Sequence, residues 1–257
     1  MSELTGIYAL WYREIKVFTR EKSRIVSSVA TPLLWLVAFG GGLGPAISGG
    51  IGTGSGSGIT GYQFIFPGIL MLTVLFTSIF FGLYLVWDKR VDFFKEVLAA
   101  PLRRTTLFVG KMLGGCTDSL IQAGLLLVLG VLFGVTYTPI AVLVLIVYIF
   151  FIAVGITSLG LAIGAQMTSF EGFGLVQSFV VLPLFFFSGA IFPLKNLPDA
   201  LQTVTLANPL TYMVDGMRGA LLPGTSQFPP ITDFGLGIAF TLVLLTLGII
   251  SFRRMSS

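Results

Sequence analysis

Long apolar segments, separated by short polar ones, dominate this chain. Residues 25–87 contain no Asp, Glu, Lys or Arg. A charged side chain at the centre of a bilayer costs about 2.5–3.5 kcal/mol on insertion scales, so a charge-free stretch of this length indicates membrane-embedded helices. Because a transmembrane helix needs about 20 apolar residues, six segments qualify as spans. We place them near residues 25–43, 62–87, 106–135, 139–165, 174–192 and 234–252.

Residues 1–24 show the pattern of an amphipathic helix rather than that of a span. Apolar side chains repeat on one stripe at about 100° per residue, and basic side chains lie opposite. We expect this helix to lie in the cytoplasmic membrane interface, with its basic face toward anionic lipid. It could also brace a cytoplasmic partner. The apolar stripe comprises Leu4, Ile7, Tyr8, Trp11, Ile15 and Phe18, and the basic face comprises Arg13, Lys16 and Arg20.

The apolar segment after the fifth span is interrupted. Pro198 can start one short helix, and the Asn208–Pro209 pair ends it. Residues 210–222 can form a second helix, in which Asp215 and Arg218 have the spacing of an intrahelical ion pair. Each piece is too short to cross a bilayer, which indicates two re-entrant outer helices. The predicted fold class is therefore an all-α polytopic membrane protein, with six transmembrane helices, an N-terminal interfacial helix and two short re-entrant helices between spans five and six.

The composition agrees with this prediction and narrows the chemistry. Mean hydropathy is +0.97 and only 10% of residues are charged, against about 25% in soluble domains. Histidine is absent and Cys116 is the sole cysteine. These two facts remove His-based triads and the usual His or Cys metal sites. We therefore predict no catalytic residue, metal site or cofactor site in this chain.

The basic residues indicate which ends of the spans face the cytoplasm. Thirteen of the fifteen Lys and Arg residues lie within residues 13–24, 89–111 or 253–254. Positively charged residues collect in cytoplasmic loops, so both termini and the 88–111 segment are expected to be cytoplasmic. The net charge of +4 follows from this bias and requires no nucleic-acid partner.

The first cytoplasmic loop carries the most varied chemistry of the chain. Residues 88–100 can form a short helix that Pro101 ends. Its two phenylalanines could pack against neighbouring membrane helices, or they could insert into a groove of a soluble partner, as interface aromatics do. The candidate residues of this loop are Asp92, Phe93, Phe94, Lys95, Glu96, Arg103 and Arg104.

Asp118 is the charge that we expect to lie deepest in the membrane. It shares one helical face with Lys111, Gly115 and Gln122, which predicts a polar stripe turned toward protein. An intramembrane carboxylate is a functional candidate by default, but Asp118 lies toward the inner end of its span, where a structural role is favoured over a proton relay. Asp118 and Gln122, together with Phe186 and Phe187, are candidates either for a substrate pathway or for internal packing.

Several motifs resemble those of a known transporter family. Residues 185–198 and 207–219 resemble the C-terminal part of a type 2 ABC export permease, and residues 98–104 with Gly110 and Lys111 resemble its cytoplasmic loop. The subgroup that the chain resembles exports daunorubicin-type drugs or nodulation-factor lipo-oligosaccharides. The resemblance covers nearly the whole chain and identifies residues 25–254 as a type 2 ABC transmembrane domain.

This resemblance implies a working arrangement. Such permeases dimerise, dock on a separate ATPase dimer in the inner (plasma) membrane of a prokaryote, and move lipid-like, drug-like or glycolipid substrates outward. The 88–100 helix would be the coupling helix that contacts the ATPase. The chain contains no G-x-x-x-x-G-K-[ST] motif, so ATP and Mg would be bound by the partner.

A channel or an ion-coupled secondary transporter is the alternative. Those proteins usually carry intramembrane charges for the coupled ion, and the predicted spans offer Asp118.

Overall fold

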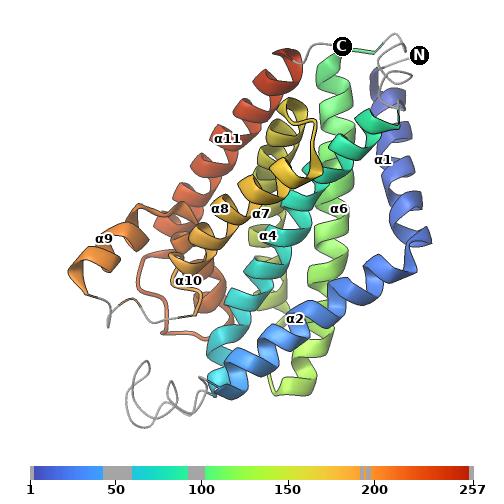
Figure 1. Cartoon of the computed structure of the whole chain (residues 1–257). Coiled ribbons are helices and arrows are strands. Elements are labelled where there is room, and N and C mark those ends of the chain that lie inside the picture. Colours follow the sequence, from blue (N-terminus) through green and yellow to red (C-terminus); the bar gives the residue numbers. More distant parts are fainter. Residues whose placement is uncertain (1–2, 43–59, 92–101, 192–193, 195–197, 255–257) are drawn as a thin grey trace.

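The computed structural model describes residues 3–42, 60–91, 102–191, 194 and 198–254. Every regular element within these ranges is a helix (Figure 1), which confirms the all-α class. Four helices are long and apolar enough to cross a membrane: α4 (Gly61–Arg90), α6 (Arg104–Gly130, extended by the 3-10 turn Val131–Phe133), α7 (Pro139–Gln166) and α11 (Pro230–Arg254). They coincide with the predicted second, third, fourth and sixth spans.

The predicted first and fifth spans are helical, but their apolar helical stretches are shorter. α2 runs over Lys22–Gly42 and its apolar part is Ala30–Gly42, whereas α8 runs over Phe170–Phe186. At 1.5 Å per residue, α8 is about 26 Å long, slightly less than the thickness of a typical hydrocarbon core. The count of six spans therefore stays a prediction.

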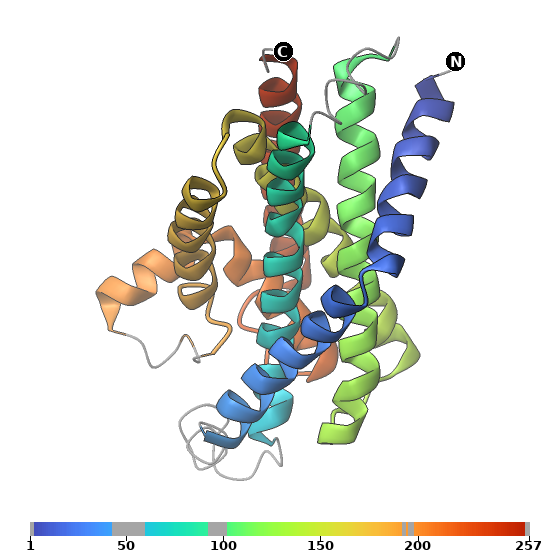
Figure 2. The ribbon, with the colours of Figure 1, turned by 45° about the vertical axis from the view of Figure 1, so that its right-hand side comes forward.

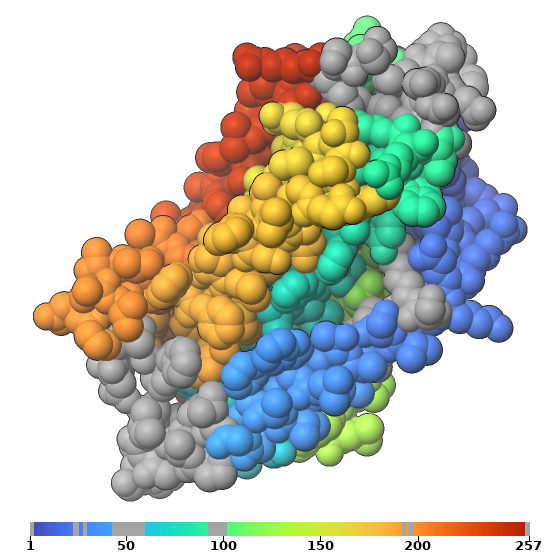
Figure 3. Space-filling view, in the orientation of Figure 1, coloured from blue at the N-terminus to red at the C-terminus, as the bar shows by residue number. Residues whose placement is uncertain are grey.

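The helices form one bundle in which α4 is central. α4 packs mainly on α7 and also on α2 and α6, and α7 packs on α11. In the space-filling view, α2 and α8 lie at the front with α4 visible between them (Figure 3). This central position explains why most of the α4 side chains, from Phe64 to Val86, are buried.

Both chain termini lie at the same end of the bundle (Figures 1 and 2). The end of α4, the start of α6 and the α7–α8 turn are at that end as well. The opposite end carries the start of α4 and the turn between α6 and α7, with α9 (Asp199–Ala207) and α10 (Pro209–Leu221) on that side. The segments that we predict to be cytoplasmic are therefore grouped together.

Direct backbone contact joins α4 to α7. A Cβ atom on Gly82 would collide with the carbonyl of Gly160, and a Cβ atom on Gly160 would lie 2.7 Å from the carbonyl oxygen of Ile79. Gly164 faces the carbonyl of Gly82 in the same way. Small residues at such positions let membrane helices approach closely, so the Gly160/Gly164 pair is part of the main helix contact of the fold.

The glycine contact generates the first prediction. Gly82→Ala should lower the stability of the folded protein by about 1–3 kcal/mol, because the new methyl group overpacks the α4–α7 contact. Gly124→Ala is the matched control, since Gly124 is also helical and no atom lies within 4 Å of its virtual Cβ. Thermal unfolding in detergent measures both. An equal melting temperature for the two variants would contradict the close contact.

Candidate functional site

Four charged side chains from three helices meet near the end of the bundle where residues 92–101 leave α4. α1 (Glu3–Arg20) contributes Arg13 and Glu14, α4 contributes Asp88, and α6 contributes Lys111. Lys111 Nζ donates to Asp88 Oδ2 at 2.5 Å and to Glu14 Oε1 at 3.0 Å. Arg13 donates to Asp88 Oδ1 at 3.1 Å and to Glu14 Oε1 at 2.8 Å. We call these four residues the ionic cluster.

The ionic cluster is electrically balanced and largely withdrawn from solvent. Lys111 is 1% exposed, and Glu14 and Asp88 are each 6% exposed. Burial alone would lower the pKa of Arg13, but its hydrogen bond with Asp88 and the charges of Glu14 and Asp88 outweigh burial and raise that pKa. Because an unpaired buried charge is strongly destabilising, each member depends on the others.

Small residues on α6 let α1 reach this position. α1 lies lengthwise beside the first half of α6 (Figures 1 and 2). Gly110 accommodates Leu10, and Gly114 accommodates the side chain of Glu14, at less than 3 Å from each virtual Cβ. Trp11 adds a hydrogen bond from its indole nitrogen to Thr117 Oγ1 at 2.9 Å. The glycines of α6 thus leave a groove on its surface, and the amphipathic helix α1 packs into this groove.

The structure shows which face of α1 packs on protein. The buried residues are Gly6, Leu10, Glu14 and Phe18, whereas the expected apolar stripe includes Leu4 and Tyr8, which are 78% and 58% exposed. Lys16 and Arg20 are exposed as expected. Arg13, which the sequence places on the basic face, forms ion pairs with Glu14 and Asp88. The sequence analysis did not single out Glu14. Its four-residue spacing from Leu10 and Gly6 places it on the same helical face as these two residues.

The last turn of α4 is also fixed on its other side. Lys89 Nζ donates to the carbonyl oxygens of Gly164 and Ala165 at 2.9 and 2.6 Å, and so caps the C-terminus of α7. The Arg90 guanidinium lies 4.6 Å from the ring centroid of Phe170 at the start of α8. α4 therefore ends in a turn tied to α1, α6, α7 and α8.

The predicted loop residues divide into described and undescribed parts. Asp92, Phe93, Phe94, Lys95 and Glu96 lie outside the described residues, so their role stays a prediction. Arg103 pairs with Glu3 of α1 at 3.8 Å, and Arg104 donates to the carbonyl of Arg253 at 3.5 Å. Both arginines are thus placed where α6 starts, close to α1 and the end of α11.

A second polar group lies in the interior of the bundle. The expected polar stripe of α6 is confirmed, since Lys111, Gly115, Asp118 and Gln122 are all buried. Thr77 donates to Gln122 Oε1 at 2.5 Å, and the hydroxyls of Ser78 and Ser119 are 2.8 Å apart. Asp118 is fully buried beside these α4–α6 contacts. Phe186 and Phe187, by contrast, lie at the end of α8 and are 42% and 38% exposed.

Four outer residues named from the sequence hold the α9–α10 region. Asn208 accepts a hydrogen bond from Leu210 N at 3.0 Å and donates to Leu184 O at 2.7 Å, while Pro209 starts α10. Asp215 accepts from two backbone amides, Gln227 N at 2.7 Å and Phe228 N at 3.0 Å. These contacts link α10 to α8 and to the segment before α11.

Arg218 has partners other than the predicted Asp215. It donates to the carbonyl oxygens of Gly189 and Ala190 at 3.0 and 3.2 Å, and its guanidinium lies 4.2 Å from the Phe64 ring centroid. The spacing of Asp215 and Arg218 predicted an intrahelical pair, but each side chain bonds to backbone groups of a different loop. The predicted Asp215–Arg218 pair is therefore wrong, and the two side chains instead attach α10 to the loops on either side of it.

Asp233 is an embedded carboxylate that sequence reasoning missed. It lies in the first turn of α11, is fully buried, and neither carboxylate oxygen has a hydrogen-bond partner among the described residues. It lies one residue before the predicted start of the last span at residue 234, so it was not considered as a residue of that span. The positive end of the α11 dipole is the feature that favours a carboxylate there.

Comparisons with known proteins agree on one family. Residues 5–222 match the profile of the ABC-2 type transporter family. The chain is 29% identical over 242 residues to the inner membrane transport permease YadH of Escherichia coli K12, covering 91% of this chain and 90% of that protein. It is 24% identical to nodulation protein J of Rhizobium leguminosarum bv. viciae (83% and 81% covered), and 26% identical to nodulation protein J of Rhizobium meliloti (90% and 84% covered).

The ionic cluster generates the second prediction. Lys111→Met should destabilise the protein by about 3–5 kcal/mol, because it leaves an uncompensated buried carboxylate. Adding Glu14→Gln should recover part of that loss by removing one of the two negative charges. The measurement is chemical unfolding in detergent micelles.

Lys16→Met is the matched control for this experiment. Lys16 is on the same helix as Arg13 and Glu14 but is exposed, so its substitution should change stability by no more than about 0.5 kcal/mol. Equal effects of Lys111→Met and Lys16→Met would show that the cluster does not hold the three helices together.

Proposed function

This chain belongs to the ABC-2 type transporter family, and we propose that it is the membrane-spanning subunit of an exporter driven by a separate ATPase. The family is one of transport permeases rather than enzymes, and apolar helices with inner-membrane relatives indicate a multi-pass inner membrane protein. The finer proposal concerns how energy reaches the helices. It rests on one observation, the ionic cluster beside the 92–101 segment.

The ionic cluster gives the 92–101 segment a rigid base. α4 ends at Arg90, two residues after Asp88, and α6 begins at Arg104, seven residues before Lys111. Asp88 and Lys111 are joined at 2.5 Å. Any force applied to the segment by a partner is therefore delivered to α4 and α6 together, and to α1 through Glu14. Lys89 is hydrogen-bonded to carbonyl oxygens at the end of α7, so a displacement of the last turn of α4 also moves α7. This is the arrangement that a coupling helix within residues 92–100 requires, since the first residues of the predicted 88–100 helix, Asp88 to Arg90, form the last turn of α4.

The partners follow from this proposal. The ATPase subunits bind ATP and Mg, and this chain contributes contacts from residues 92–104 but no nucleotide site. A second copy of the permease completes the pathway as a homodimer within membrane lipids. Both termini face the cytoplasm of a prokaryotic cell, which is supported by the grouping of the basic segments at one end of the bundle. The substrate moved outward is lipid-like, drug-like or a glycolipid.

An ion-coupled transporter is the second candidate. The observation that favours it is the presence of two embedded carboxylates, Asp118 and Asp233, both fully buried, because intramembrane carboxylates commonly bind coupled ions. Reconstitution with and without the ATPase separates the two candidates. Transport driven by ATP without an ion gradient supports the exporter, whereas transport driven by a gradient without ATPase supports the alternative.

The third prediction tests the coupling segment. The Phe93→Ala/Phe94→Ala double variant should weaken ATPase binding at least tenfold and abolish transport, because interface aromatics often contribute about 2 kcal/mol each. Membrane insertion should be unchanged, since no span loses a residue. Co-purification with the ATPase and ATP hydrolysis in liposomes give the readout.

Phe179→Ala is the matched control for the coupling test. Phe179 is on α8, away from the cytoplasmic loop, and is 78% exposed. It should leave ATPase binding intact. Normal ATPase binding and transport by the Phe93/Phe94 variant would contradict the proposal that this segment contacts the ATPase.

The fourth prediction tests the membrane topology. With Cys116→Ser as background, Ser55→Cys, Asp199→Cys and Ser226→Cys should each react with an impermeant thiol reagent added outside. Ser256→Cys should react only after the membrane is opened. Asp199 and Ser226 flank α9 and α10, so their labelling from the same side means that this region returns without crossing. Labelling of Ser226→Cys only from the cytoplasm would require an additional crossing and an odd number of spans.

A further inference from the structure

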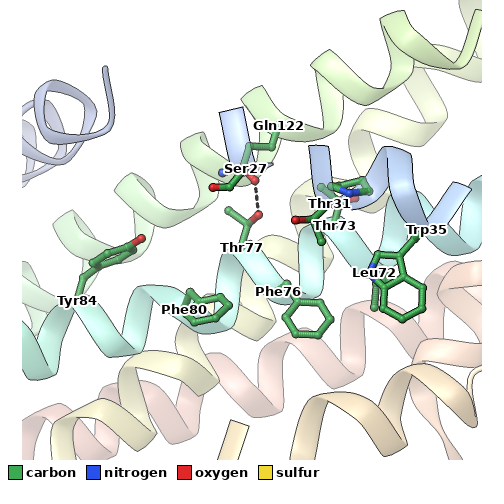
Figure 4. Close-up of a pocket in the computed structure, with 11 residues that line it drawn as sticks. Ser27, Thr31, Trp35, Leu72, Thr73, Phe76, Thr77, Phe80, Tyr84 and Gln122 are labelled. Carbon is green, nitrogen blue, oxygen red and sulfur yellow. Dashed lines mark hydrogen bonds between the residues drawn. The ribbon is translucent and has the colours of Figure 1, made fainter. Parts of the chain in front are cut away.

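A cleft lies between α2, α4 and α6, near the middle of α4 (Figure 4). Its volume is about 300 Å³, at the lower end of the range for small-molecule sites. Trp35 of α2 and Phe80 of α4 line it and are 38% and 37% exposed, so the cleft opens at the surface where α2 crosses α4. It is separate from the ionic cluster and from the outer contacts of α10.

α4 supplies two different walls of this cleft. Leu72, Phe76, Phe80 and Tyr84 recur at four-residue intervals and so share one helical face. Thr73 and Thr77 each lie one position further round the helix and form a hydroxyl row beside the aromatic one. In Figure 4, Phe76 and Phe80 lie on one side of the α4 ribbon, while Thr77 points to Gln122 on the other. The cleft is therefore apolar along one edge and polar along the other.

The Gln122 amide nitrogen is a hydrogen-bond donor at the polar edge. Thr73 donates to Ile69 O at 2.9 Å, and Thr77 donates to Gln122 Oε1 at 2.5 Å. The Gln122 side chain is thereby held at the cleft, but its amide nitrogen donates to no acceptor within the described part of the chain. A donor at the wall of the cleft that has no protein acceptor can bond to a ligand, so a bound molecule with an oxygen acceptor at this point gains a hydrogen bond.

The lining residues also argue against a charged ligand. No Asp, Glu, Lys or Arg is among the residues that line the cleft, so nothing there neutralises a charged ligand. A lipid is polar at its head group and apolar along its acyl chains, and an acyl chain in the cleft would leave the Gln122 nitrogen unpaired beside methylene groups. A molecule whose polarity changes from one long edge to the other satisfies both walls at once.

We propose that this cleft binds uncharged, flat, ring-containing compounds that carry a carbonyl or ether oxygen along one edge. The rings lie against Phe76 and Phe80, and the oxygen accepts a hydrogen bond from the Gln122 amide nitrogen. The inference deepens and rests on the proposed function, because it makes such compounds the substrate class of the exporter. Entry is from the lipid, where uncharged ring compounds partition, through the opening beside Trp35.

The experiment measures binding to the full chain in lipid nanodiscs without any ATPase. Trp11→Phe and Trp87→Phe leave Trp35 as the sole tryptophan, and it reports directly from the cleft. Flavone is the probe, because it is flat, neutral and carries a carbonyl oxygen. 2-Phenylnaphthalene offers a similar ring outline without oxygen, and flavone-8-carboxylate adds a negative charge.

Flavone should quench Trp35 saturably, and both comparison compounds should bind at least tenfold more weakly. Gln122→Met should weaken flavone binding about tenfold, which corresponds to the loss of one hydrogen bond, and should leave 2-phenylnaphthalene unaffected. Phe76→Leu should weaken both compounds. Phe179→Leu, the same change on the exposed face of α8, should weaken neither. Phe76→Leu keeps the test valid if Gln122→Met does not fold.

Two results would overturn the proposal. Equal binding of flavone and 2-phenylnaphthalene, with no effect of Gln122→Met, would mean that the cleft is only an apolar surface for lipid. Tighter binding of flavone-8-carboxylate would mean that the ligand is charged. Because no ATPase is present, failure here leaves the exporter proposal standing. ATP-driven export of flavone from liposomes that also contain the ATPase supports the substrate assignment, and saturable binding without such export removes the assignment.

Discussion

The ion pair between Lys111 and Asp88 is the contact on which the arrangement of one end of the bundle depends. These charges come from the start of α6 and the end of α4. Glu14 and Arg13 complete the charge balance from α1. Buried charges tolerate no missing partner, so the three helices are fixed relative to one another wherever this cluster is intact.

The polar contacts differ in kind along the length of the bundle. Where α4 ends and α6 begins, charged side chains bond to one another and to the terminal carbonyls of α7. In the middle, hydroxyl and amide groups bond between α4 and α6, with the Gln122 amide beside the cleft. At the opposite end, Asp215 and Arg218 bond to backbone groups of loops. Charged side chains thus fix both ends of the bundle, whereas neutral hydrogen bonds join the helices in its middle.

The sequence predicted the long helices well, because the bilayer constrains them directly. Backbone groups in lipid must bond within the segment, so the apolar runs became α4, α6, α7 and α11, with ends within several residues of those predicted. It did not predict which side chains meet. Glu14 and Lys111 are 97 positions apart, and the face of α1 that packs is chosen by Gly110 and Gly114 on another helix. The cleft likewise arises only when α2 crosses α4.

Why the α1 contact is ionic can be argued from its geometry. Leu10 against Gly110 and Glu14 against Gly114 repeat at one-turn intervals on both helices, so apolar side chains alone would allow α1 to slide along α6 by a turn with similar burial. A charge at Glu14 removes that freedom, because the shifted positions would leave it buried without Lys111. Replacing such pairs by apolar groups often preserves stability. The gain from the ionic cluster is therefore a single register of α1, and with it a defined position for the end of α4 and the start of α6.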